Sequence, residues 1–243
     1  MSEIPGPPPY PRPDEGAGKF DSDPWWSRGD DAFKESLVGT MAETAEVVGY
    51  TDAARHLRHY LAATGEDLEV DVDRIMREVQ SFRGAVARAT ANLVASVAKR
   101  AAKNDDYGES LQFRDDSWRS HYLSQDEDAN WFFALGGIRF AITGVVTVQR
   151  PGKQASRPEV ALRYRAHLWD YYNWDSGKST TIGPVTIEDE WMAGLHTAGF
   201  AREYEVVGTS ELLRYSGPLP KAGELPGPAD GRGGRDDPGR EPA

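Results

Sequence analysis

Residues Val160–Tyr172, with the sequence VALRYRAHLWDYY, determine the fold of the C-terminal half. Apolar side chains occupy every second position from Val160 to Leu168, and mostly polar ones lie between them. Such alternation is typical of a strand with one face on a core and the other toward water. The stretch therefore predicts a long strand in an antiparallel sheet.

The stretch Trp131–Val148 shows the same two-residue period. Apolar side chains from Ile138 to Val148 share one parity, and polar ones share the other. Gly136, Gly137 and Gly144 interrupt the pattern, and we expect bends or bulges there. We predict a second strand over the whole of this stretch.

A helix and a last strand are predicted after these two strands. Thr186 is a candidate N-cap for a helix from Ile187 to Ala198, with Asp189 in the reciprocal capping position. The segment Arg202–Tyr215 then alternates again and contains a glycine at its centre, Gly208. The pattern predicts a final strand bent at that glycine.

The N-terminal half has a helical period instead. We predict four helices, at residues 32–48, 51–61, 73–82 and 86–103. The fold class is therefore α+β: a helical N-terminal half followed by an antiparallel sheet or half-barrel with one inserted helix.

The proline distribution suggests where the folded part begins and ends. Of the 16 prolines, seven lie in residues 1–30 and six in residues 218–243. Both ends also lack apolar periodicity, which predicts disordered tails. We expect a helical region at 31–112 and an α+β effector domain at 113–217.

Composition excludes several classes of function. The net charge of −11 disfavours broad nucleic-acid binding, because an acidic surface repels phosphate backbones. The absence of cysteine excludes thiol catalysis, thiolate metal sites and disulfides. The sequence from Met1 has no classical signal peptide and no apolar run long enough to span a bilayer, so export would need a specialised or non-classical route.

The candidate chemistry lies where the strand 160–172 ends. Its parity places Asp170 and Tyr172 on the apolar face, where a carboxylate is costly unless it is paired, hydrogen-bonded or bound to metal. The functional interpretation is a catalytic or metal-binding carboxylate. The structural alternative is that Asp170, Asn173 and Asp175 only form a turn.

The other candidate motifs are weaker. Gly177-Lys178-Ser179 resembles a phosphate-binding loop, but Tyr172 stands where that loop needs glycine. His56 and His59 have helical spacing without a third ligand, which favours surface polar residues. His196 lies off the apolar stripe of its predicted helix, and the sequence leaves open whether it is solvated or points toward the turn at Asp170.

The order of features resembles the catalytic domain of colicin M and related bacteriocins. It covers Ala134-Leu-Gly-Gly-Ile138, the strand end at Val148, the Asp170-x-Tyr172 strand end, Ala198-Gly199 and Glu203-Tyr204. The family motif is Asp-x-Tyr-Asp-aromatic-Asn, with His-Arg four positions later. Those bacteriocins cleave the undecaprenyl-linked peptidoglycan precursor beside its pyrophosphate, with a divalent cation.

Carried over to this chain, the resemblance matches Asp170, Tyr172 and Trp174 to the motif. Asn173 replaces the second aspartate and Asp175 replaces the asparagine, while Ser179 and Thr180 occupy the His-Arg positions.

Two explanations follow from these departures. In the first, Asp175 and His196 (or His167) take over the lost roles. The catalytic set is then Asp170, Tyr172, Asp175 and His196, with Asp170 and Asp175 as ligands of a divalent cation such as Mg²⁺. In the second, the fold persists without catalysis.

Two functions are therefore expected. The first is an antibacterial effector that is made in the bacterial cytoplasm and exported. It acts on a lipid-linked envelope precursor, and its protein partners are an immunity or secretion component. The second is a non-catalytic interaction or structural component of a secretion or phage-like assembly.

Overall fold

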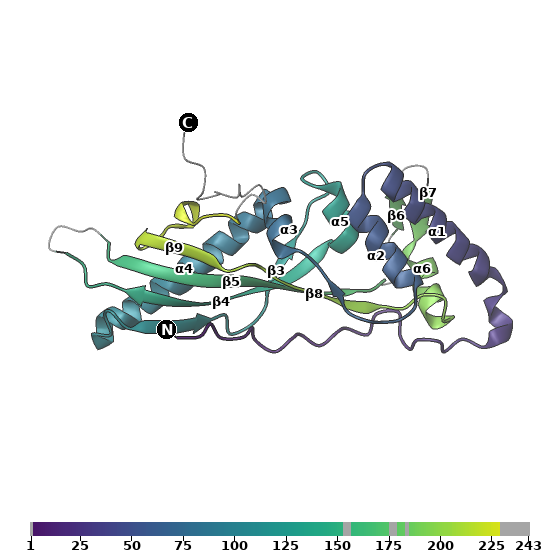
Figure 1. Ribbon diagram of the computed structural model, residues 1–243. Helices are drawn as coiled ribbons and strands as arrows, with labels where there is room; N and C mark the ends of the chain where they lie inside the picture. Colours follow the sequence, from purple (N-terminus) through teal and green to yellow (C-terminus); the bar gives the residue numbers. More distant parts are fainter. Residues whose placement is uncertain (1, 153–156, 175–178, 183–184, 229–243) are drawn as a thin grey trace, which may run out of the picture.

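The structure is a computed structural model that describes residues 2–152, 157–174, 179–182 and 185–228 (Figure 1). Side chains are not described for Ser27, Gly29, Ala32 and the described residues between 179 and 187. The helical elements are η1 (Trp25–Asp30), α1 (Asp31–Val47), α2 (Thr51–Leu61), α3 (Val72–Glu78), α4 (Gln80–Asn104), α5 (Ala129–Leu135), α6 (Asp189–Thr197) and η2 (Ala222–Glu224). The strands are β1 (Leu68–Glu69), β2 (Ser110–Arg114), β3 (Arg119–Tyr122), β4 (Gly137–Val148), β5 (Glu159–Tyr172), β6 (Ser179–Ile182), β7 (Val185–Glu188), β8 (Tyr204–Thr209) and β9 (Leu213–Pro218).

The predicted α+β class is confirmed. The main sheet has the order β1-β8-β5-β4-β2, with β3 also on β4 and β9 also on β5. Every pair is antiparallel except β1–β8, which is parallel. β6 and β7 form a separate two-stranded sheet. The long central pair is therefore β4–β5, and β5 ends where it pairs with β8.

Strand β5 forms as its alternation predicts. Its even-numbered residues from Val160 to Leu168 are buried, and Phe140 of β4 lies opposite Leu168. His167 is also buried, between two threonine hydroxyl groups: its Nε2 lies 2.9 Å from Thr143 Oγ1 and its Nδ1 3.0 Å from Thr209 Oγ1. On the polar face of β5, His167 is therefore hydrogen-bonded inside the protein and not exposed to water.

The stretch predicted as one strand from Trp131 is in fact a helix followed by a strand. Asp128 accepts a hydrogen bond from the Trp131 N–H at 2.9 Å, which caps the start of α5. Gly136 ends this helix with a φ of +61°, a backbone conformation that glycine adopts without strain. The strand therefore begins only at Gly137.

The last helix and strand also differ from the prediction. α6 begins at Asp189 with Glu188 as its N-cap, and Thr186 and Ile187 belong to strand β7 instead. The predicted final strand is divided into β8 and β9, which pair with different parts of β5. A strand that must reach both halves of β5 has to break between Thr209 and Leu213.

The helices and the sheet share one apolar core. Helix residues such as Met41, Ile75 and Val94 belong to the same buried cluster as Ile142 of β4 and Leu168 of β5. The predicted boundary between residues 112 and 113 falls inside strand β2. In addition, β1, which lies between two helices in the sequence, pairs with β8.

The N-terminal segment, residues 2–24, has no regular secondary structure. The sequence predicts a disordered tail here, but the segment lies against the folded part of the chain. In Figure 1 it runs along the sheet from β2 to α6. Arg163 donates to the Ser2 carbonyl oxygen at 2.9 Å, and the Trp118 indole donates to that of Pro9 at 2.9 Å. Near the other end, the Asp23 N–H donates to the Thr197 carbonyl oxygen at 2.9 Å.

The C-terminal segment is described as far as residue 228. Leu225 is buried against the core and η2 packs on α4, so the folded part extends beyond the predicted limit at Gly217. The rest of the predicted C-terminal tail, 229–243, lies outside the described residues. Among the described helices, none is long and apolar enough to cross a membrane.

We expect Gly144→Ala to destabilise the chain by about 1–3 kcal/mol, because overpacking at a closed position forces strain. A Cβ there would lie 2.3 Å from the Phe113 ring and 2.7 Å from the Arg163 carbonyl oxygen. The control is Gly39→Ala in α1, where a Cβ would meet no atom within 4 Å. Urea unfolding of both variants measures the difference, and equal stabilities would contradict the packing of β2 on β4.

Candidate functional site

The end of β5 opens into a pocket of about 280 Å³. One wall is aromatic and apolar, formed by Tyr122, the end of α5 and the Gly136-Gly137 turn. The other wall consists of Asp170 to Trp174 together with Asp189 at the start of α6. Two of the predicted site residues, Asp170 and Tyr172, therefore line one pocket, and the turn Ala134–Gly137 of the family resemblance faces them.

Asp170 is a strongly perturbed carboxyl group of this pocket. Burial raises its pKa to about 8, and the negative charge of Asp14 adds to this effect. The backbone N–H of Tyr171 and the charge of Arg139 act in the opposite direction, but they do not outweigh burial. A carboxyl group in this state can donate or accept a proton near neutral pH.

Tyr172 lies beside Asp170 in an aromatic cluster. Its ring stacks on Tyr204 with 4.9 Å between centroids and contacts His56 at 5.6 Å. Its buried hydroxyl group and the buried indole N–H of Trp174 form no hydrogen bond of ordinary geometry with the described residues, but the Trp174 indole opposes the rise in the Tyr172 pKa that burial causes. The two polar groups therefore lie near each other beside the pocket.

Asp189 is the second carboxylate in the pocket, and it was not among the predicted site residues. It is 7% exposed and stands at the first position of α6. The sequence offered it only as a reciprocal helix cap. In the structure it follows β7 directly and begins α6.

His196 does not lie in this pocket. It is buried, its Nδ1 accepts the Glu203 backbone N–H at 3.1 Å, and its Nε2 lies 3.2 Å from the Gly18 carbonyl oxygen. It lines a neighbouring pocket of about 340 Å³ together with Glu203 and Tyr171. Both ring nitrogens are thus occupied, and the structure gives His196 a role in holding the N-terminal segment.

Glu203 is a buried carboxylate that was not among the predicted site residues, although the pair Glu203-Tyr204 belongs to the family resemblance. It accepts the backbone N–H groups of Ala17 at 2.9 Å and Trp174 at 3.2 Å. The Tyr171 hydroxyl donates to its Oε2 at 3.4 Å. Burial raises its pKa, and these donors together with His196 counteract the rise. Glu203 thereby links the N-terminal segment to the turn after β5.

The remaining predicted residues have other outcomes. His167, the alternative to His196, lies in the threonine cluster, where burial lowers its pKa to about 4. His56, interpreted as a surface residue, is fully buried, and burial lowers its pKa to about 3. Asp175 lies outside the described residues.

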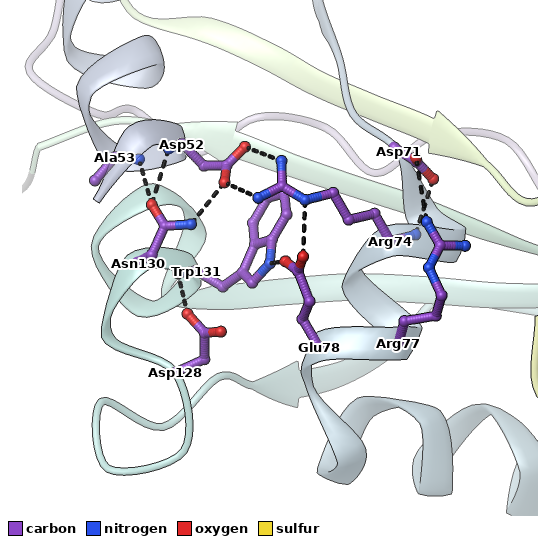
Figure 2. A network of polar contacts seen from close by, with 9 residues as sticks. All are labelled: Asp52, Ala53, Asp71, Arg74, Arg77, Glu78, Asp128, Asn130 and Trp131. Carbon is purple, nitrogen blue, oxygen red and sulfur yellow. Dashed lines mark hydrogen bonds and ion pairs between the residues drawn. The ribbon is translucent and has the colours of Figure 1, made fainter. Parts of the chain in front are cut away.

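A network of charged and polar residues holds α5 against the N-terminal helices (Figure 2). The Asn130 carboxamide accepts the backbone N–H of Asp52 at 2.8 Å and donates to its carboxylate at 2.6 Å. Arg74 of α3 donates to both oxygens of that carboxylate, at 3.0 and 2.8 Å. The Trp131 indole donates to Glu78 at 2.6 Å, and Arg74 lies over its ring. Helices α2 and α3 thereby fix the helix that forms the apolar wall of the pocket.

The family resemblance implies a divalent cation, but few side chains in this pocket could bind one. Among the described residues, no group of three or more His, Asp or Glu side chains could hold a metal ion. Asp170 and Asp189 nevertheless share one pocket. Magnesium is commonly held by one or two carboxylates plus water and substrate phosphates, and the pair fits that mode.

We expect the free energy of unfolding to depend on pH through Asp170. Its carboxyl group keeps its proton in the folded chain up to about pH 8, whereas it loses the proton near about pH 4 in the unfolded chain. Between these values the folded chain binds more protons, so stability falls as pH rises and levels off above the folded pKa. Urea unfolding across this window should show a smaller fall for Asp170→Asn than for the unaltered chain, and equal slopes would contradict the raised pKa.

No family model and no curated protein matches the chain. Among solved structures, it is similar to PaeM, a colicin M-like bacteriocin produced by Pseudomonas aeruginosa, with 13% identity and a TM-score of 0.37. The match covers 68% of this chain and 50% of PaeM, so the chain matches about half the length of that protein. The chain thus bears a weak structural resemblance to a colicin M-like bacteriocin.

Proposed function

We propose that the chain is an antibacterial effector whose pocket at the end of β5 hydrolyses a lipid-linked peptidoglycan precursor at its pyrophosphate. One observation carries the proposal: Asp170, a carboxyl group with a pKa near neutrality, shares an aromatic-walled pocket with Asp189. The Asp-x-Tyr match to the colicin M family falls on the same strand end.

The two carboxylates suit a pyrophosphate substrate only together with a cation. Asp170 and Asp189 would hold Mg²⁺, and Asp175 follows close in the sequence. When bound, the cation would offset the phosphate charge and make a coordinated water more acidic. With the cation bound, the pKa of Asp170 would fall below the value of about 8 that burial gives it, and the carboxylate oxygen not bound to the cation could accept a proton from the attacking water.

The opposite wall suits the lipid part of such a substrate. Tyr122 is 64% exposed at the rim, and its ring meets Phe132 of α5 edge-on, with 6.0 Å between centroids. Phe133 and Leu135 continue the apolar wall inward. An isoprenoid chain adjoining the pyrophosphate would gain favourable burial on this surface.

The test is hydrolysis of purified undecaprenyl-linked precursor by the intact protein, with and without Mg²⁺. Release of a phosphorylated head group that requires both the cation and Asp170 is the expected result. A folded protein that is inactive in both conditions and does not inhibit bacterial growth would reject the enzymatic function.

A second candidate function is non-catalytic binding to a partner protein. Several exposed aromatic side chains near the N-terminus favour it. Trp25 and Trp26 of η1 are 79% and 71% exposed, and Phe33 of α1 is 73% exposed. Clustered exposed aromatic side chains are typical of protein interfaces. A stoichiometric partner recovered by the intact chain, and lost on Trp25→Ser with Trp26→Ser, would support this function.

A further inference from the structure

A second pocket, of about 730 Å³, lies between the helical half and the loop that joins β8 to β9. None of the residues that line it lines the pocket at the end of β5. Its walls include the carboxylates of Glu69, Asp71, Asp73 and Glu211 and the guanidinium groups of Arg55 and Arg77.

Two of these charged groups largely satisfy each other. Asp71 caps α3 by accepting the Arg74 N–H at 2.9 Å, and its second oxygen lies 3.8 Å from Arg77. Arg55 donates to the backbone carbonyl oxygen of Glu69 at 3.1 Å. The carboxylates of Glu69, Asp73 and Glu211 are therefore the acidic groups that could receive a ligand.

Asp73 has the feature that points to a ligand. It is 8% exposed, and its Oδ2 accepts the Glu211 N–H at 2.6 Å. Its Oδ1 is buried and has no hydrogen-bond partner in the part of the chain that the structure describes. Burial raises its pKa, and the hydrogen bond from the Glu211 N–H offsets only part of that rise. A buried acceptor without a partner is rare in native proteins and calls for an explanation, of which a bound molecule is one.

We propose that this pocket binds an organic cation whose guanidinium or primary ammonium group donates to Asp73 Oδ1. Both groups present several N–H donors, which suits neighbouring carboxyl oxygens. The lining also contains apolar residues, among them Val70, Leu212 and Leu213, which suit the methylene stem of such a ligand.

The cation can come from two sources that share this chemistry. One is a free molecule or the side chain of another protein. The other is the chain itself, because Pro228 lines the pocket and the sequence after it contains Arg232, Arg235 and Arg240. The pocket does not depend on the proposed hydrolysis, so either idea can fail without the other.

The experiment is a calorimetric titration of the full-length chain with agmatine, which has a guanidinium group at one end and an ammonium group at the other. We expect saturable binding that Asp73→Asn weakens by at least about tenfold, since a hydrogen bond to a charged group contributes that much. Asn retains an oxygen to accept the Glu211 N–H, so this variant keeps the existing contact. The matched control is Glu43→Gln, an equal charge change at an exposed position of α1, which should leave binding unchanged.

A further variant, Arg232→Gln with Arg235→Gln and Arg240→Gln, separates the two sources. Tighter agmatine binding by this variant than by the unaltered chain would mean that the chain's own arginines compete for the pocket. Equal binding would assign the pocket to an external cation. The proposal is overturned if neither chain binds agmatine, or if Asp73→Asn binds it as well as the unaltered chain does.

Discussion

Asp170→Asn should lower the rate of the proposed pyrophosphate hydrolysis by about 10²- to 10⁴-fold, the range that a general acid or base contributes. The amide cannot accept a proton from water, and it is a poorer ligand for a cation than a carboxylate. The loss should appear in kcat, measured as release of the phosphorylated head group from the lipid-linked precursor.

The same substitution should leave the chain folded. Asp170 is partly buried, and its raised pKa shows that the pocket disfavours its charged form. An uncharged amide of nearly equal size therefore removes an electrostatic cost. The control is Asp126→Asn at an exposed position, which should change neither the rate nor the melting temperature. A folded Asp170→Asn protein with full activity would remove Asp170 from the mechanism.

Trp131→Ala should lower the free energy of unfolding by about 3–5 kcal/mol, as expected for the loss of a large core aromatic side chain. Trp131 is 2% exposed, and its indole donates to Glu78 at 2.6 Å. Removal leaves a cavity and also deprives Arg74 of the ring beneath it. Because α5 forms the apolar wall of the pocket, we expect activity to fall together with stability.

A matched control is available within the same chain. Trp25 is 79% exposed, so Trp25→Ala should change stability by no more than about 0.5 kcal/mol. Urea unfolding followed by circular dichroism gives both values. If Trp131→Ala proved as stable as Trp25→Ala, the network in Figure 2 would not hold α5 in place.

A strand can be predicted from the alternation of apolar and polar residues where one of its faces packs on the core and the other does not. Strand β5 matches its pattern because each of its faces has a distinct partner. Residues 131–135 do not form the predicted strand, because a short helix capped by Asp128 can bury Trp131 as well as a strand can. Strand β1 has two residues, too few for any period to appear, and its pairing with β8 depends on a contact distant in sequence.

The part of the candidate site that lies on one strand, β5, could be predicted from the sequence. Asp170 and Tyr172 follow from the parity of β5, and both line the pocket. Asp189 and Glu203 were missed because their positions depend on where α6 and β8 lie relative to β5. Among these, only Asp189 offered a local signal, a carboxylate at a helix start, and that signal has a common structural explanation. His196 could not be assigned, since its partner Gly18 lies in a segment without any periodic pattern.

The pairing of β1 with β8 has a consequence for how this architecture can be inherited. Parts of a chain can be exchanged as units only where few contacts cross the boundary between them. An exchange at residue 113 would cut β2 and would separate β8 from the two residues that complete its edge. It would also leave α5 without the aspartate and arginine that hold it. In any recombinant that folds, the helices must therefore be inherited together with the sheet.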